Sequence, residues 1–135
     1  MAQPVRLETL DHDSAMDDTL DAVKVVAQTA TGVDIGDVGH NITSVAHGVY
    51  VVTTAGTDVA LVQVSTSAKL VVVQAQTDNT TGIAVGGTGV DATIATGTGI
   101  ILNPGDSITL PISDLINVYI DAITSGEGVR YTYFT

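Results

Sequence analysis

The chain has 135 residues, enough for one domain with a buried hydrophobic core. Its 15 acidic residues outnumber its 4 lysines and arginines, and the resulting net charge of −11 argues against direct binding to nucleic acid or to an anionic membrane. It contains no cysteine, which excludes a disulfide framework and thiolate metal ligands.

The first 21 residues form an acidic segment with few apolar side chains. Its acidic residues are Glu8, Asp11, Asp13, Asp17, Asp18 and Asp21. Because such a composition buries too little apolar surface to fold alone, we expect residues 1–21 to form an extended N-terminal arm. The arm is either a solvated terminus or a segment that becomes ordered against a partner. In the second case, its spaced apolar residues Val5, Leu7 and Leu10 are the candidate partner-binding residues.

The sequence shows no targeting or membrane segment. No apolar run typical of a signal peptide follows Met1, and no stretch approaches the roughly 20 apolar residues of a membrane span. We therefore expect synthesis in a cytoplasm, with neither a membrane nor, given the net charge, nucleic acid as a partner.

Residues 17–30 fit two patterns. Leu20, Val23 and Ala27 lie on one helical face, and the aspartates before them suit the N-terminal end of a helix dipole. Val23, Val25 and Ala27 also alternate, and β-branched side chains lose rotamer freedom in a helix. We favour a strand here over a short helix.

Strands and turns alternate from Gly48 onward. Residues 48–54 form a predicted strand, and a hairpin turn at 55–58 joins it to residues 59–64. Residues 70–76 begin with a continuous apolar run, which is typical of a central strand covered on both faces. This region therefore contributes at least three strands to the predicted fold.

A glycine-rich region follows. Turns at residues 78–82 and 86–89 flank an apolar strand at 83–85, and residues 92–95 form a further short strand. A sandwich or a barrel typically has a strand roughly every 8 to 12 residues, with Gly and Asp turns between the strands.

The C-terminal region has the clearest alternation of apolar and polar residues. Residues 100–102 lead into Asn103-Pro-Gly-Asp106, where proline and glycine suit a type II turn that brings two strands together. Apolar and polar residues then alternate over most of 107–134. The sequence therefore predicts a single all-β domain, a β-sandwich or jelly roll, over residues 22–135.

No metal or cofactor site is expected. Asp11, Asp13 and Asp17 belong to the densest set of carboxylates, but Ala15 and Met16 stand where a calcium loop needs a ligand and a glycine. The segment 86–91 matches the opening of a calcium-binding β-helix repeat, yet that device requires tandem copies. The histidines, which lack the spacing of a zinc site, are His12, His40 and His47.

Catalytic motifs are also missing from the sequence. Neither Lys24 nor Lys69 follows a glycine, as a phosphate loop requires, and no Gly-x-Ser-x-Gly elbow occurs. The two glutamates, Glu8 and Glu127, lie in the arm and at the tip of a predicted hairpin, which does not favour a catalytic pair. We expect the protein not to be an enzyme.

The tyrosines leave an alternative open. Tyr50, Tyr119, Tyr131 and Tyr133 lie in predicted strands, where tyrosines commonly cap the edge of a core. Placed on one face, they would instead form a sugar-binding surface. The alternative function is therefore a receptor- or glycan-binding fibre or adhesin module.

The C-terminal half carries a succession of turn and strand motifs. They are Gly86-Gly87, Leu102-Asn-Pro-Gly-Asp106, Asp114-Leu115, Val118-Tyr-Ile120 and Gly128-Val-Arg-Tyr-Thr-Tyr133. This succession resembles the C-terminal half of small virion proteins of tailed bacteriophages, particularly head decoration (cement) proteins. The resemblance implies a non-enzymatic β-sandwich or jelly roll, often trimeric, that clamps capsid subunits from the outside. We thus expect a homotrimer on the capsid exterior, with the major capsid protein as its partner.

Overall fold

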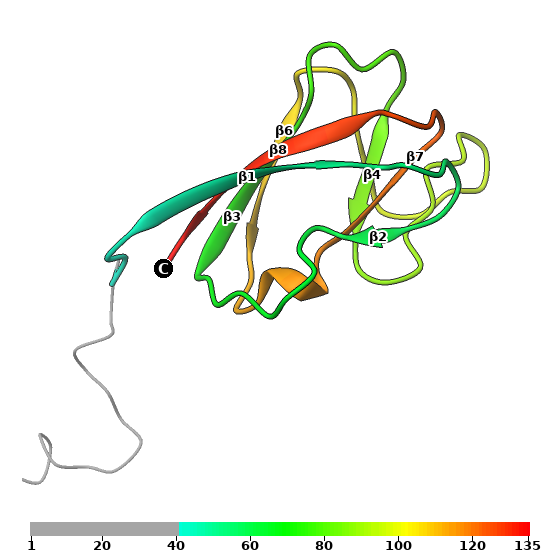
Figure 1. The fold of residues 1–135 in the computed structure, drawn as a ribbon. Helices are drawn as coiled ribbons and strands as arrows, with labels where there is room; N and C mark the ends of the chain where they lie inside the picture. Colours follow the sequence, from blue (N-terminus) through cyan, green and yellow to red (C-terminus); the bar gives the residue numbers. More distant parts are fainter. Residues whose placement is uncertain (1–40) are drawn as a thin grey trace, which may run out of the picture. The chain divides into compact units, whose positions relative to one another are not determined.

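The structure of the protein is a computed structural model that describes residues 41–135. This part of the chain contains strands and one short 3-10 helix (Figure 1). The elements are β1 (Val45–Val51), β2 (Val59–Ala60), β3 (Leu70–Ala75), β4 (Ile83–Gly86), β5 (Ile100–Leu102), β6 (Ser107–Pro111), η2 (Leu115–Asn117), β7 (Tyr119–Ala122) and β8 (Gly128–Phe134). The predictions for residues 1–40, including the arm, lie outside the described residues.

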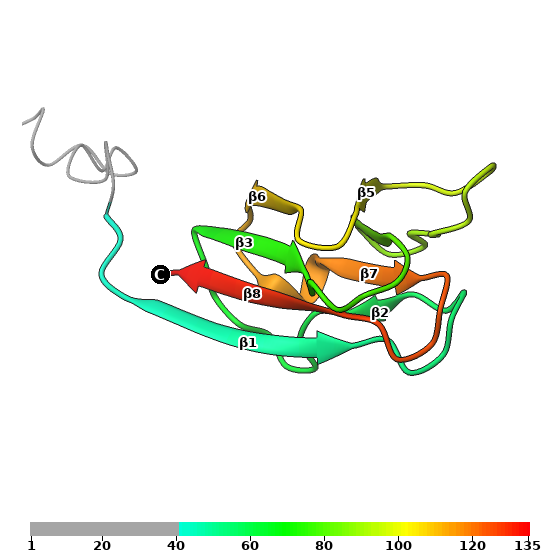
Figure 2. The same cartoon turned by 90° about the horizontal axis from the view of Figure 1, so that it is seen from above.

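The strands form two four-stranded antiparallel sheets. Sheet A has the order β1-β8-β3-β6, and sheet B has the order β2-β7-β4-β5. Figure 2 shows β8 between β1 and β3, so the C-terminal strand lies in the interior of its sheet. The predicted all-β sandwich is confirmed for the described residues.

Most connections carry the chain from one sheet to the other. The predicted hairpin at residues 55–58 is wrong, because β1 belongs to sheet A and β2 to sheet B. The turn at Asn103–Asp106 has the expected geometry: Gly105 has a φ of 88°, and Asp106 N donates to Asn103 O at 2.8 Å. It nevertheless links β5 of sheet B to β6 of sheet A. A turn sequence determines the local path of the chain, whereas tertiary packing selects the strand partner.

The core lies between the sheets. Its fully or nearly fully buried residues are Val52, Leu61, Ala68, Val71, Val73, Ala75, Ile83, Val85, Leu102, Leu115, Val118, Ile120, Ala122 and Val129. The alternation predicted for β6 and β8 is confirmed, because Ile108, Leu110, Tyr131 and Tyr133 pack against this cluster from one face of sheet A.

Strand β3 is central in sheet A, as predicted, but it is not covered on both faces. Val71 and Val73 are fully buried, whereas Gln74 is exposed. Strands β4 and β7 of sheet B are instead covered on both faces, since the neighbours Ile83 and Ala84 are fully buried, as are Ile120 and Asp121 almost completely. A continuous apolar run does not by itself show which strand another part of the chain will cover.

The segment between β4 and β5 covers the outer face of sheet B. Its residues Val90 and Ala92 form a second buried cluster with Ala84, against which Tyr119 packs. The strand predicted at residues 92–95 is not formed, because this stretch turns back on itself, with Gly97 N donating to Thr93 O at 2.8 Å. The outer face of sheet B is therefore partly interior.

Candidate binding surface

One register row of sheet A presents four apolar side chains on its outer face. Val45 pairs with Phe134, Phe134 with Leu70, and Leu70 with Pro111. We call this set the apolar row. Val45 is 59% exposed, Pro111 is exposed, and Phe134 and Leu70 are half-buried. An apolar row that crosses a whole sheet on its solvent side is typical of a surface that another chain covers.

The apolar row begins at an edge strand that no other strand covers in the part of the chain that the structure describes. Strands β1 and β6 are the outer strands of sheet A, and Pro111 at the end of β6 removes a backbone donor from that edge. The seven-residue β1 contains no proline, and Val49 on its outer face is 58% exposed. His47 is exposed on the same strand. Within the described residues, β1 therefore offers a free row of backbone groups beside an apolar surface.

The tyrosines do not share a sugar-binding face. Tyr50, Tyr131 and Tyr133 pack against the main core, whereas Tyr119 packs against the second cluster on the other side of sheet B. Gln63 Nε2 donates to the hydroxyl of Tyr50 at 3.1 Å, and the rings of Tyr131 and Tyr133 stack with centroids 6.3 Å apart. Burial, together with the neighbouring Tyr133, raises the pKa of Tyr131 above its usual value. The four residues cap core edges, as is common for tyrosines in strands.

Glu127 does not lie at an exposed hairpin tip. Its side chain is only 5% exposed, and its Oε1 accepts hydrogen bonds from Thr80 N at 2.6 Å and from Thr81 N at 2.7 Å. The hydroxyls of both threonines also donate to this carboxylate. Burial by itself raises the pKa of Glu127, but these hydrogen bonds outweigh it and leave the pKa below its usual value. Glu127 thus links the β3–β4 connection to the start of β8 through hydrogen bonds.

Asp91 and Asp114 also have structural partners. Thr93 donates its hydroxyl and its backbone N–H to Asp91, which lowers the pKa of that carboxyl. Asp114 caps η2, and its pKa is lowered by the Ser65 hydroxyl and by the backbone N–H groups of Ile116 and Thr66. Both carboxylates stabilise loop conformations.

The Gly86–Asp91 segment forms a glycine turn, which is the simpler of its two interpretations. Val90 N donates to Gly87 O at 3.1 Å, and Gly89 has a positive φ of 82°. No group of three or more metal-ligating side chains occurs among residues 41–135.

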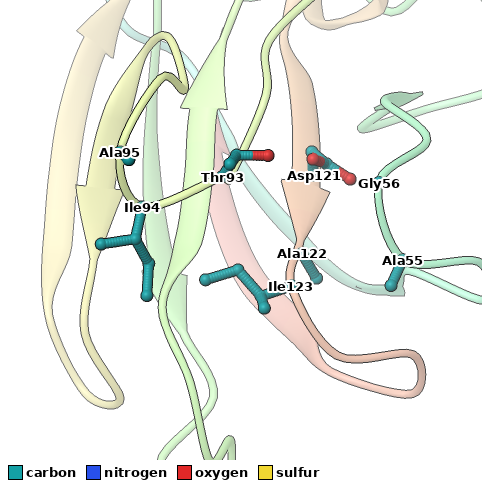
Figure 3. Close-up of a pocket in the computed structure, with 8 residues that line it drawn as sticks. All are labelled: Ala55, Gly56, Thr93, Ile94, Ala95, Asp121, Ala122 and Ile123. Carbon is teal, nitrogen blue, oxygen red and sulfur yellow. The ribbon is translucent and has the colours of Figure 1, made fainter.

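A pocket of about 530 Å³ lies on the outer side of sheet B (Figure 3). Its lining residues are Ala55, Gly56, Thr93, Ile94, Ala95, Asp121, Ala122 and Ile123. Asp121 is only 1% exposed, although the alternation along β7 predicts that it faces solvent. The sequence gives no sign of this burial, because the covering segment, residues 87–99, approaches from a distant part of the chain.

The residues that the sequence singles out for partner binding, Val5, Leu7 and Leu10, lie outside the described residues. The apolar row could not be predicted from the sequence, although its members alternate correctly in their strands, because only the register of four strands brings them together. Within residues 41–135, no helix has the length and hydropathy needed to cross a membrane.

Comparison with known proteins adds no assignment. No model of a known protein family matches the chain, and no curated protein sequence is significantly similar to it.

Proposed function

We propose that this protein is a non-enzymatic capsid decoration protein, which binds the outside of a phage head as a homotrimer and stabilises the shell. The observation that carries the proposal is the edge of β1, which no other strand of residues 41–135 covers, beside the apolar row on sheet A. An exposed apolar surface beside a free strand edge does not help a small acidic domain to stay in solution. We therefore assign this surface to contact with another protein chain.

The β1 edge suits an extended partner segment. A strand added to this edge obtains backbone hydrogen bonds from β1, and its side chains reach the outer face beside Val45 and Val49. The predicted arm, with Val5, Leu7 and Leu10, supplies a segment of this kind to a neighbouring subunit or to the major capsid protein.

Multiplicity provides the affinity that a single contact lacks. Each fully buried aliphatic side chain contributes roughly 1.5 to 3 kcal/mol, while fixing each residue of an extended segment costs about 1 to 2 kcal/mol. One arm therefore adds little, but three contacts on one trimer make each later contact effectively intramolecular and raise the avidity.

Light scattering and head-binding assays test the proposal. We expect the full chain to be a trimer and to saturate expanded heads that lack it. Val49→Lys, on the outer face of β1, should reduce head occupancy without changing the melting temperature, because its side chain is 58% exposed. The matched control Thr88→Lys places the same charge at an exposed position of the β4–β5 connection, which covers sheet B and not sheet A, and should bind normally.

A monomer that does not bind heads would contradict the proposal. Saturable binding to host glycans that Tyr119→Ala or Tyr131→Ala abolishes would instead establish the adhesin alternative. The described tyrosines do not favour this result, since they pack against two different clusters.

A further inference from the structure

The pocket over β7 contains a buried polar atom that the protein itself does not satisfy. Oδ2 of Asp121 accepts a hydrogen bond from Ala92 N at 2.8 Å, whereas Oδ1 is buried and has no hydrogen-bond partner. Leaving a buried polar atom unpaired costs about 1 to 3 kcal/mol, and more when the group is charged. Asp121 lines the pocket, so a group bound there is positioned to supply the missing donor once it displaces the side chains that cover Oδ1.

The surroundings of Asp121 define the chemistry of that donor. Figure 3 shows the Thr93 hydroxyl directed toward Asp121, with Ile94 and Ile123 beside them. Thr93 Oγ1 donates its proton to Asp91 at 2.6 Å, so it retains lone pairs that accept from a ligand. The other lining residues are alanines and a glycine. The pocket thus combines two acceptor oxygens with apolar walls.

A primary ammonium on an aliphatic stem matches this combination. The ammonium group has three donors and a positive charge, and the stem packs on apolar side chains, as lysine does at protein surfaces. Guanidinium is a poorer match, because its planar fork favours a bidentate carboxylate, and Oδ2 of Asp121 is already occupied. The permanent cations of the described residues, Lys69 and Arg130, do not line the pocket.

The rim of the pocket indicates that the ammonium belongs to a protein. Ile94 is 90% exposed and Ile123 is 39% exposed, so two large apolar side chains are open to solvent at the entrance of the pocket. A free amine leaves that surface uncovered, whereas a protein surface that presents a lysine covers it. The net charge of −11 also favours a basic partner surface.

We infer that the Asp121 pocket binds a lysine side chain of a partner protein, with Asp121 Oδ1 and Thr93 Oγ1 accepting hydrogen bonds from its ammonium group. This inference does not depend on the partner being a capsid protein, and the pocket lies on sheet B, whereas the apolar row lies on sheet A.

Titration with n-butylammonium, which reproduces the lysine side chain, tests the inference directly. In heteronuclear NMR spectra of the full chain, we expect saturable shifts of the amide signals of Ala92, Thr93 and Asp121. The neutral analogue n-butanol should produce no saturable shift of these signals, because it lacks the charge and two of the donors.

Three variants test the individual parts of the site. Asp121→Asn retains an acceptor for Ala92 N but loses the charge, and it should weaken n-butylammonium binding about tenfold. Asp78→Asn removes the same charge from an exposed position outside the pocket and should bind as the wild type does. Ile94→Ser should weaken binding of n-butylammonium but not of methylammonium, which has no stem to pack. Because Ile94 is 90% exposed, this variant keeps the fold even if Asp121→Asn does not.

Three outcomes would overturn the inference. Equal binding of n-butanol would show a purely apolar pocket, and stronger binding of Ca²⁺ at the same amide signals would show a metal site. No saturable shift with n-butylammonium would show that only water satisfies Asp121. In each case the head-binding experiment with Val49→Lys remains informative about the proposed function, since Val49 lies on sheet A.

Discussion

The side chain of Asn79 exchanges two hydrogen bonds with the backbone of Gly128. Asn79 Nδ2 donates to Gly128 O at 2.9 Å, and Gly128 N donates to Asn79 Oδ1 at 3.0 Å. All of these groups are buried, and a Cβ at Gly128 would lie 2.5 Å from the carbonyl oxygen of Tyr50. These two hydrogen bonds join the β3–β4 connection, which contains Asn79, to the first residue of β8.

Replacing Asn79 should destabilise the domain. Asn79→Ala leaves the buried Gly128 N–H without a partner, so we expect the free energy of unfolding to fall by about 1 to 3 kcal/mol. Urea unfolding measures this change. The adjacent Asp78→Ala, at an exposed position, should remain within about 0.5 kcal/mol of the wild type, and equal effects of the two variants would contradict the role of Asn79.

Glu127 should make stability depend on pH in a defined direction. Its pKa in the folded protein lies below the usual 4.5, so its contribution is fully present above pH 4.5 and is lost as the pH falls through the folded pKa. The wild type should be more stable than Glu127→Gln at neutral pH, and the difference in unfolding free energy should shrink below pH 4.5.

The other carboxylates are common to both proteins, so their contributions largely cancel in that difference. Asp78→Asn serves as a control, because it removes an exposed carboxylate and retains Glu127 and its threonine donors. A difference between wild type and Glu127→Gln that is independent of pH would show that the hydrogen bonds do not depend on ionisation of Glu127.

A residue larger than Gly48 does not fit, because the ring of Tyr131 occupies the space where its Cβ would lie. The two residues pair across β1 and β8, and a Cβ at Gly48 would overlap the ring. Gly48→Ala should therefore cost roughly 1 to 3 kcal/mol of stability by displacing the ring from its packing. In a Tyr131→Leu background the same substitution should cost much less. Strict additivity in this double-mutant cycle, measured by chemical denaturation, would rule out the overlap as the cause.

Deletion of residues 1–10 should separate folding from assembly. The deletion removes Val5, Leu7 and Leu10 but leaves the described β-sandwich intact, so we expect a nearly unchanged melting temperature. Occupancy of heads, and with it their resistance to heat, should fall because the extended contacts are lost. If the truncated protein saturates heads as tightly as the full chain does, the clamp resides in the β-sandwich alone.

Local sequence determined the fold class and the positions of most strands. Period-two alternation predicted the inward faces of β6 and β8, and the Asn103–Asp106 turn formed with the expected positive φ at Gly105. These features depend on contacts within a few residues, because alternation follows from the pleat and turn geometry from the conformational limits of Pro and Gly.

Only the tertiary structure decided which strands pair and which outer faces are covered. The register of sheet A assembled the apolar row from four strands, and the segment that carries Ala92 folded over β7 and buried Asp121. The alternation along its strand predicts that Asp121 faces solvent, and the neighbouring glycines predict that Glu127 lies in an exposed turn. Both are buried because segments distant in the sequence pack against them, and no local pattern encodes contacts that form only when the two sheets close on a common core.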